Sequence, residues 1–427
     1  MHFLNLTLAA FAALSGVLGL WQWLAARKFP LHRNIAVENF APAVSILKPL
    51  KGCDETTAES LASWFKQHYA GPVEILFGVA AANDPVCAIV RRLIAENQAN
   101  VVAQASRLCV PACSELTGET PVPLSGIRAR LVVCENLAGT NAKAAKLAQL
   151  EKLAAHDLIL ISDADVRVPP DFLASFVSPL RDEPTALVNC FYRLANPATP
   201  AMRWEAIAIN ADFWSQDLQS QTLRPLDFAL GAAILVRRTA LNEIGGFQSL
   251  ADCLADDYQL GHRIARQGHR IALCPVVVEC WDAPQGWTRV WKHQLRWART
   301  IRVCQPLPYF FSLLSNATLW PMLWFMAGLP ELSATAKVHG AMHNFQFSFA
   351  LPWGAMLAPA LCLLRIFLAQ NLQRRFTPER ELISQLWLVP VKDLLNVALW
   401  LGAFLGRTIE WRGRKMILRR DGTLANI

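Results

Sequence analysis

The chain has 427 residues, of which 53% are hydrophobic and only 17% charged, and its formal net charge is +8. Soluble domains carry about 25% charged residues, so this composition excludes an ordinary soluble protein and favours a membrane portion beside a folded domain. Fifteen tryptophans agree with this, because tryptophan favours the membrane–water interface. The sequence contains no nucleic-acid-binding module, so the positive charge fits anionic headgroups or phosphates, and no nucleic-acid partner is expected.

Four apolar stretches approach the ~20 residues that cross a bilayer as a helix. The first covers residues 3–24 and contains no charged residue. It is followed by Arg27, Lys28 and Arg33, and such a basic cluster places the next segment in the cytosol. The other stretches lie near the C-terminus, at about 307–328, 346–370 and 384–406. The segment between the first stretch and these three is expected to be a water-soluble domain.

The basic tail after the last stretch conflicts with three full crossings. Three crossings after a cytosolic domain would place the tail outside, but basic residues near membrane spans are typical of the cytosolic side. One stretch is therefore expected to be re-entrant or interfacial. The first candidate is 384–406, because it contains Pro390, Lys392 and Asp393, and charged groups at membrane depth must pair or line a cavity.

Strand and helix patterns alternate in the middle of the chain, which predicts an α/β layer fold with a largely parallel sheet. In such sheets a ligand binds at the carboxyl ends of the strands. Candidate strands are at 43–47, 73–79, 130–134, 157–161, 186–191 and 232–236. Candidate helices are at 56–68, 85–97, 141–154 and 257–267. The sequence lacks GxGxxG after the first strand, GxxxxGK[ST] and GxSxG, which argues against dinucleotide oxidoreductases, P-loop NTPases and α/β-hydrolases.

Residues 104–127 are rich in Pro, Ser and Thr and have no periodicity. We expect a long surface loop there and assign it no function.

Two aspartates follow the candidate strand at 157–161. In SDADV, Asp163 and Asp165 are one residue apart, so both carboxylates can reach one divalent cation such as Mg²⁺ or Mn²⁺, which in turn binds a diphosphate. A solvated turn is the alternative, because DxD alone is common. The position directly after an apolar strand favours the metal site.

A second acidic pair, Asp256 and Asp257 in ADDY, begins the candidate helix at 257–267. Carboxylates at a helix start are common caps, so a capping role is the structural alternative. One of the two can instead point into the cleft and accept the proton of an acceptor alcohol, since a general base must first lie within hydrogen-bond reach.

The segment WTRVWKHQLRWARTIR, residues 287–302, predicts a basic, tryptophan-rich helix in the membrane interface. A membrane anchor without a catalytic role is the alternative interpretation of this segment. Arg296 offers a further role, because a guanidinium can hold a leaving diphosphate in a bidentate way.

The order of these motifs resembles the ceramide glucosyltransferase family, glycosyltransferase family 21, which includes bacterial hopanoid-associated glycosyltransferases. The resemblance covers nearly the whole chain, from VSILKPLKG through SDADV and ADDY to the tail TIEWRGRKMILRRDG. It implies a GT-A-type nucleotide-diphospho-sugar transferase domain of the α/β class, with one N-terminal and about three C-terminal transmembrane or re-entrant helices. The expected divisions are a membrane anchor at 1–28, a cytosolic transferase domain at 29–285, an interfacial helix at 286–304, and a C-terminal membrane domain with a basic tail at 305–427.

The resemblance also assigns roles to single residues. Asp84 in AANDPV would face the uridine, and Asp257 would be the base. The first position of the family's (R/Q)xxRW motif is His293 here, and Gln294 comes one place late. The implied catalytic residues are Asp257, His293, Arg296 and Trp297; the implied substrate-binding residues are Lys48, Asp84, Lys143, Asp163 and Asp256; Asp163 and Asp165 would hold the metal ion.

The implied reaction is an inverting, metal-dependent transfer of a sugar from a UDP-sugar, UDP-glucose first, to a lipid hydroxyl. The acceptor is ceramide, or a hopanoid such as bacteriohopanetetrol with N-acetylglucosamine as the sugar. A processive polysaccharide synthase and a non-catalytic membrane scaffold are the remaining alternatives. In each case we expect an integral membrane protein with its catalytic domain on the cytosolic side, in the inner membrane if the source is bacterial.

Overall fold

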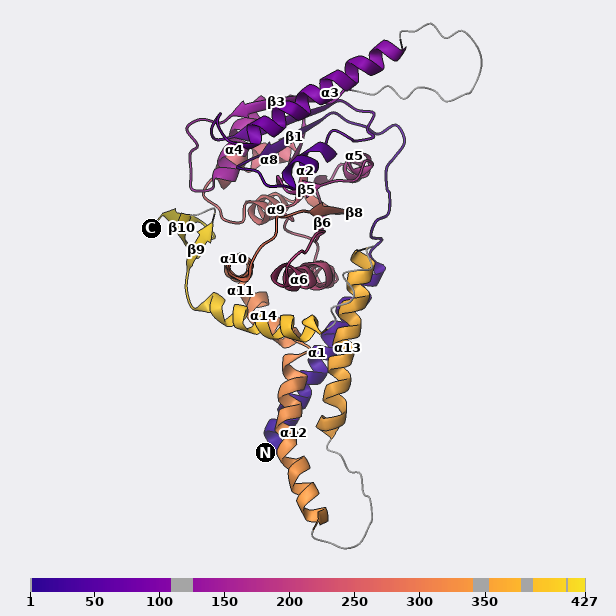
Figure 1. The fold of residues 1–427 in the computed structure, drawn as a ribbon, viewed down its shortest axis with the longest axis vertical. Coiled ribbons are helices and arrows are strands. Elements are labelled where there is room, and N and C mark those ends of the chain that lie inside the picture. The colour runs from indigo at the N-terminus through magenta and orange to yellow at the C-terminus, as the bar shows by residue number, and fades with distance from the viewer. Residues whose placement is uncertain (1, 109–125, 341–352, 378–386, 412–413, 427) are drawn as a thin grey trace, which may run out of the picture. The chain divides into compact units, whose positions relative to one another are not determined.

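The computed structural model describes residues 2–108, 126–340, 353–377, 387–411 and 414–426. Two compact units are present, and each combines distant parts of the chain (Figure 1). Residues 1–29, 198–224 and 285–410 form what we call the helical unit. Residues 30–197, 225–284 and 411–427 form the sheet unit.

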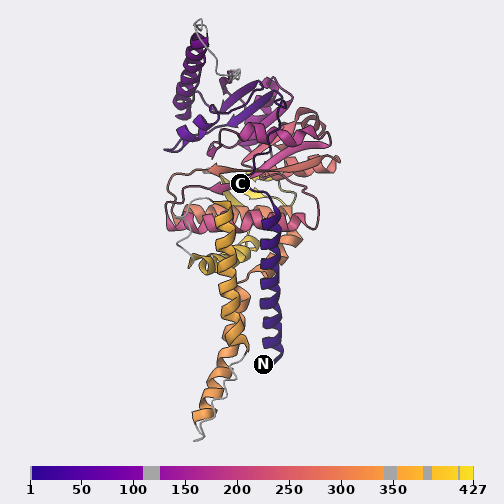
Figure 2. The ribbon, with the colours of Figure 1, turned by 90° about the vertical axis from the view of Figure 1, so that its right-hand side faces the viewer.

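The strands of the sheet unit appear as arrows in Figure 2. They form a mixed sheet with the order β3-β2-β1-β4-β7-β6-β8-β5. The half that contains β1 is parallel, because β1 pairs with β2 and β4 in parallel and β2 pairs with β3 in parallel. β7 is antiparallel to both β4 and β6, β6 is parallel to β8, and β5 is antiparallel to β8. The strands are β1 (Val44–Pro49), β2 (Val73–Val79), β3 (Arg128–Val133), β4 (Leu158–Ser162), β5 (Val166–Arg167), β6 (Thr185–Leu194), β7 (Ala233–Arg237) and β8 (Arg270–Cys280).

Helices of the sheet unit cover this sheet and bury its apolar side chains. Leu147 and Leu150 of α4 and Leu260 and Ile264 of α9 join one core cluster with strand residues such as Ile161. The helical elements are α2 (Thr57–Ser63), α3 (Val86–Leu108), α4 (Ala142–Leu153), α5 (Phe172–Val177), η1 (Ser178–Arg181), α8 (Arg238–Glu243), η3 (Phe247–Leu250) and α9 (Asp256–Arg266). The tail adds β10 (Arg414–Leu418), paired antiparallel with β11 (Leu424–Asn426). This arrangement confirms the predicted α/β class.

The six predicted strands correspond to β1, β2, β3, β4, β6 and β7. The expected loop at 104–127 is wrong in its first part, because α3 continues to Leu108, and residues 109–125 lie outside the described chain. The expected helix at 85–97 is correspondingly too short.

Strand β8 was not predicted, and Pro275 in its middle explains why. Proline cannot donate a ladder hydrogen bond, so a run that contains one is usually not assigned as a strand. The fold accommodates it with a shift of register against β6 between Cys190 and Tyr192. The Pro275 carbonyl instead accepts a hydrogen bond from the backbone of His32, at 2.8 Å.

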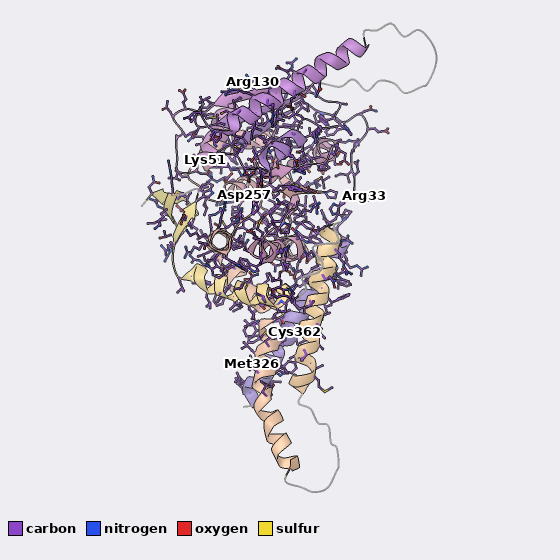
Figure 3. The ribbon with its side chains drawn as sticks, viewed as in Figure 1. Arg33, Lys51, Arg130, Asp257, Met326 and Cys362 are labelled. Atoms are coloured by element: carbon purple, nitrogen blue, oxygen red, sulfur yellow. The ribbon has the colours of Figure 1, made fainter. Side chains whose placement is uncertain are left out.

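The helical unit contains long apolar helices and several shorter ones. α1, α12 and α13 pack against one another (Figure 1), and Met326 on α12 and Cys362 on α13 are labelled in Figure 3. The elements are α1 (His2–Lys28), α6 (Pro200–Ile207), the π-helix η2 (Ala208–Phe213), α7 (Trp214–Gln221), α10 (Trp287–Cys304), α11 (Pro306–Phe311), η4 (Ser312–Ser315), α12 (Leu319–Gly340), α13 (Trp353–Phe376), α14 (Leu388–Phe404) and β9 (Thr408–Trp411).

Two of the described helices are long and apolar enough to cross a membrane: Phe3–Lys28 and Met356–Phe376. The stretch predicted at 307–328 is broken, because Pro306–Ser315 and Leu319–Leu329 meet at a bend of 47° and make one further crossing only if they are counted together. α14 has 17 residues, fewer than the ~20 that a straight crossing requires. The described part of the stretch predicted at 384–406 is therefore a short helix.

Helix α14 turns its charges inward and its apolar side chains outward. Lys392 and Asp393 are buried, whereas the side chains exposed on the helix and the residue after it share one apolar stripe. These are Val391, Leu394, Ala398, Leu401, Phe404 and Leu405. In a water-soluble protein an amphipathic helix has the opposite polarity. The outer side of α14 is thus suited to a lipid environment.

The inward charges of α14 belong to a closed ionic cluster with α13 and η2. Arg365 binds Asp212 and Asp393, each at 2.8 Å, and Lys392 pairs with both of these aspartates. The Thr318 hydroxyl, next to the break before α12, donates to Asp393 at 2.6 Å. Two positive and two negative charges balance within the cluster, which joins four segments of the helical unit.

We predict that Arg365→Ala destabilises the helical unit, because it leaves two buried aspartates with Lys392 as their remaining cationic partner in the cluster. Removal of one partner of a buried ion pair costs about 3–5 kcal/mol. The thermal unfolding temperature of the purified protein in detergent should fall by several degrees. Arg374→Ala, which removes an exposed arginine of the same helix, is the matched control. Equal unfolding temperatures for the two variants would contradict the prediction.

Candidate active site

The aspartate pair after β4 lies on a turn that a buried lysine supports. Lys48 at the end of β1 is fully buried, and its ammonium donates to the Ser162 hydroxyl at 3.2 Å and to the Asp163 carbonyl at 2.5 Å. The ammonium also lies 4.4 Å from the centre of the Trp64 ring. Burial lowers the pKa of Lys48 to about 7, although the carboxylates of Asp165 and Asp163 oppose this change. The lysine thus contacts the backbone of the turn, and its assignment to substrate binding stays a prediction.

A second lysine joins the two predicted acidic pairs. The Lys143 ammonium lies 2.8 Å from Asp163 and 3.5 Å from Asp256. Burial alone would lower the pKa of Lys143, but the carboxylates of Asp163, Asp256 and Asp257 raise it above the usual range for lysine. Lys143 therefore stays protonated and holds the end of β4 next to the start of α9.

Asn141, which the sequence reasoning did not select, fixes the position of Lys143. It is fully buried, and its side-chain oxygen caps α4 by accepting from the backbone of Lys143 at 2.9 Å and of Ala144 at 3.1 Å. Its amide group donates to the Cys253 carbonyl at 2.8 Å and to Asp256 at 3.3 Å. An asparagine before a helical pattern is a standard N-cap signal, so the sequence offered this information.

Asp257, labelled in Figure 3, is partly exposed in the first turn of α9. Burial and the neighbouring Asp256 raise its pKa to about 6, while Lys143 opposes this change. Gly231 lies directly against it: a Cβ atom at this glycine would be 2.4 Å from the Asp257 carboxylate. The loop before β7 therefore needs a residue without a side chain at this position.

Asp165 lies near two other carboxylates, those of Asp163 and Asp282. Its pKa is raised to about 7, first by burial and then by the carboxylates of Asp163 and Asp282. A divalent cation would relieve this repulsion, and carboxylate oxygens are suitable ligands for Mg²⁺ and Mn²⁺. In the described part of the chain, no group of three or more His, Cys, Asp or Glu side chains is arranged to hold a metal ion. Asp163 and Asp165 offer two carboxylates to such a cation, and their assignment as metal ligands stays a prediction.

Asp84 supports the loop that follows β1. Its carboxylate accepts from the backbone of Gly52 at 3.0 and 3.1 Å and from the backbone of Val86, the first residue of α3, at 3.1 Å. Gly52 has a φ of +65°, which favours glycine. These contacts are structural, and the predicted contact of Asp84 with the uridine is untested.

His293, Arg296 and Trp297 lie on α10 in the helical unit. The imidazole of His293 packs edge-on against Trp297, with ring centroids 5.0 Å apart and an interplanar angle of 62°. Its Nδ1 atom is 2.7 Å from Glu205, a residue of α6 that the sequence reasoning missed. The (R/Q)xxRW-like motif is thus held together with a helix from another part of the chain.

Comparison with known proteins identifies the family of the chain. A family profile described as glycosyl transferase family 21 matches residues 6–113 and 101–424. The chain is 22% identical over 253 residues to ceramide glucosyltransferase 3 of Caenorhabditis elegans, over 58% of this chain and 48% of that protein. It is also 22% identical over 250 residues to ceramide glucosyltransferase 1 of the same organism, over 57% and 47%. The matched part spans about half the length of these curated relatives.

Among solved structures, the chain resembles a mannosyltransferase of Pyrobaculum calidifontis in complex with GDP-Man and Mn²⁺. The TM-score is 0.49 at 19% sequence identity, over 92% of this chain and 99% of that one.

We predict that Gly231→Ala slows glycosyl transfer at least tenfold, because the added methyl group must displace the Asp257 carboxylate. A misplacement of about 1 Å in an active site can cost about 100-fold in rate. Steady-state kinetics with the intact protein measure this effect. Gly286→Ala is the matched control, because a Cβ atom at Gly286 meets nothing within 4 Å. A normal rate for Gly231→Ala would mean that the position of Asp257 is unimportant.

Proposed function

Since the chain belongs to glycosyl transferase family 21, we propose that this glycosyltransferase moves a sugar from a UDP-sugar, UDP-glucose first, to a hydroxyl group of a membrane lipid. One observation supports this most directly: Lys143 draws the acidic pairs after β4 and at the start of α9 to one place at the edge of the sheet. A site for a nucleotide-sugar needs cationic and metal-binding groups, and a transfer to an alcohol needs a base. Both are available in this arrangement.

In the proposed reaction Asp257 acts as the general base. Its carboxylate takes the proton of the lipid hydroxyl, and the oxygen attacks the anomeric carbon from the face opposite UDP. A new carbon–oxygen bond forms as the bond to the diphosphate breaks, and UDP leaves with the electron pair. One such displacement inverts the configuration of the sugar. Asp256 would stay with Lys143 and Asn141 and keep the α9 start in place.

The charge that grows on the departing diphosphate needs cationic partners. We assign Lys143 and Arg296 to this task, since electrostatic stabilisation of a leaving group is usually the largest contribution to such transfers. Asp163 and Asp165 would hold Mg²⁺ or Mn²⁺, which when bound would neutralise diphosphate charge. Lys48 keeps the turn of these two aspartates in place through its hydrogen bonds to Ser162 and to the Asp163 carbonyl.

The lipid acceptor is proposed from the named relatives, which are ceramide glucosyltransferases. Ceramide is therefore the first acceptor to test, and a hopanoid polyol with UDP-N-acetylglucosamine is the second. Among the residues that the structure describes, two helices are long and apolar enough to span a membrane, or three with the bent pair, which is fewer than we expect of a channel that extrudes a polysaccharide. A single transfer to a lipid thus suits the helical unit better than processive synthesis.

The tail determines how often the chain crosses the membrane. The backbone of Leu254 donates to Gly422 at 3.1 Å, and that of Leu424 donates to Asp252 at 2.8 Å, so the tail folds as part of the sheet unit. The number of crossings between the main part of the sheet unit and its tail must then be even. The bent helix pair and α13 supply two crossings, and α14 lies in the interface with its apolar stripe toward lipid. Arg27 and Lys28 support a cytosolic position of the sheet unit, because basic residues next to a span favour the cytosolic side.

A reconstitution assay tests the proposed function. The purified chain is incubated in lipid nanodiscs with Mg²⁺ or Mn²⁺, with labelled UDP-glucose or UDP-N-acetylglucosamine, and with ceramide or bacteriohopanetetrol. A labelled lipid is the expected product with at least one pair. Hydrolysis of the donor without a lipid product, or no turnover with any pair, would overturn the proposal.

We predict that kcat/KM falls as the pH decreases through about 6, because the raised pKa of Asp257 leaves its carboxyl group protonated below that value and unable to accept a proton. Asp257→Asn should lower the rate by about 100-fold or more. Asp157→Asn, which changes an exposed carboxylate before β4, should leave both the rate and the pH profile unchanged. If Asp257→Asn retains the wild-type rate, Asp257 is not the base.

We also predict opposite locations for two reporter fusions in a bacterial inner membrane. A fluorescent protein fused after Ile427 should fold in the cytosol, whereas alkaline phosphatase fused after Gly340 should be active on the outer side. Full phosphatase activity of a fusion after Ile427 would show that α14 crosses the membrane.

A further inference from the structure

A buried carboxylate lies behind the (R/Q)xxRW-like motif. Glu205 of α6 has a relative exposure of 4%, and its Oε1 atom lies 2.7 Å from the His293 Nδ1 atom and 2.7 Å from the Gln294 side-chain nitrogen. All three residues belong to the helical unit. Burial of a carboxylate is expensive unless hydrogen-bond donors satisfy it. Two consecutive side chains of α10 supply these donors.

The contact determines which nitrogen of His293 carries a proton. An ionised carboxylate can only accept hydrogen bonds, so Nδ1 must be the donor. In a neutral imidazole the other nitrogen, Nε2, then has a free lone pair. The His293 side chain is 34% exposed, whereas Gln294 is buried. The imidazole is therefore anchored on one edge and accessible elsewhere.

Aromatic packing keeps Glu205 at a fixed distance from α10. Its neighbour Trp204 is fully buried and packs against Trp287 and Trp291, with ring centroids 5.8 and 6.1 Å apart. Phe213, after the same stretch of helix, packs against Trp297 at 6.1 Å. Helix α6 and the following π-helix thus contact α10 between Trp287 and Trp297. Small shifts of the carboxylate relative to His293 would require these rings to repack.

We propose that Glu205 is a positioning residue: it holds His293 as the tautomer protonated on Nδ1 and presents Nε2 as a hydrogen-bond acceptor to the polar head of the lipid acceptor. This role rests on the proposed function. The inference also narrows the proposed function, because it requires an acceptor that carries a second hydrogen-bond donor, a hydroxyl or amide N–H, in addition to the hydroxyl that receives the sugar. A lipid with a single hydroxyl and no other donor would lose this contact.

A double-mutant cycle separates positioning from a general structural role. Glu205→Gln should lower kcat/KM for the lipid about tenfold, with the larger part in KM for the lipid and little change in KM for the UDP-sugar. In a His293→Ala background the same substitution should change kcat/KM less than twofold, because its target is gone. The proposal would be overturned if Glu205→Gln lowered kcat/KM equally with wild-type His293 and with His293→Ala. It would also be overturned if Glu205→Gln caused no loss of kcat/KM when His293 is present.

Two further variants complete the kinetic experiment. Gln294→Ala removes the other donor to Glu205 and keeps the histidine contact, so kcat/KM for the lipid should fall less than threefold. Glu205→Asp retains a carboxylate and should recover part of the activity that Glu205→Gln loses. A loss from Gln294→Ala as large as that from Glu205→Gln would assign the effect to packing of α10 and would contradict the role of His293.

A spectroscopic measurement does not depend on any activity. Nitrogen NMR of the full chain with ¹⁵N-labelled histidine, assigned by comparison with His293→Ala, should show His293 protonated on Nδ1. In Glu205→Gln the protonated nitrogen should become mixed or move to Nε2. If the wild-type signal shows protonation on Nε2 alone, the positioning role fails, even where the transferase assay succeeds. If NMR shows His293 protonated on Nδ1 but the transferase assay yields no lipid product, the positioning role stands and the proposed function fails.

Discussion

The shared ammonium of Lys143 is the interaction on which the candidate site depends. Carboxylates after β4 and at the start of α9 repel one another, and partial burial strengthens that repulsion because water screens it less. Lys143 lies between them, at 2.8 Å from Asp163 and 3.5 Å from Asp256. Its own position follows from Asn141, which caps α4 and binds the start of α9 at the same time. One short stretch of chain thus sets the distance between the proposed metal-binding pair and the proposed base.

The same arrangement explains why the pKa values of two neighbouring lysines, Lys48 and Lys143, shift in opposite directions. Lys48 is surrounded by protein, and its pKa decreases to about 7, whereas Lys143 faces several carboxylates and its pKa rises. Both lysines lie near Asp163. Lys48 binds the backbone carbonyl of Asp163, whereas Lys143 pairs with the Asp163 carboxylate. A donor diphosphate would therefore meet Lys143, and the buried Lys48 would act on it only through the turn.

The helical unit meets a different constraint, because its exterior is suited to lipid. The charges buried between α13, α14 and η2 are balanced against one another, since Arg365 and Lys392 pair with Asp212 and Asp393. The sequence already marked Lys392 and Asp393 as groups that must pair, since an isolated charge in an apolar stretch is costly. It did not reveal the partners. Asp212 is 180 residues from Lys392, in a π-helix that no periodic pattern indicated.

The same distinction between local and distant information applies to the fold and the site. The strands around the site could be predicted, because buried runs such as 157–161 end in acidic or glycine-containing turns. The start of α6 had a readable signal in Thr199 and Pro200, which was not used, and the Thr199 hydroxyl does accept from Met202 at 3.2 Å. Strand β8 was hidden by Pro275, whose tolerance depends on a register shift against another strand. Glu205 had no local signal at all, because its partner His293 is 88 residues away.

The contact of Glu205 with His293 and Gln294 affects how the altered motif on α10 is interpreted. Compared with (R/Q)xxRW, this chain has His293 at the first position and Gln294 one place late, which looks like a displaced glutamine. Residues next to each other on a helix normally face different directions. Here both side chains reach the same oxygen of Glu205, one from the buried side and one from the exposed side. Gln294 is buried on this shared oxygen, so His293, whose side chain is 34% exposed, is the accessible residue of the pair.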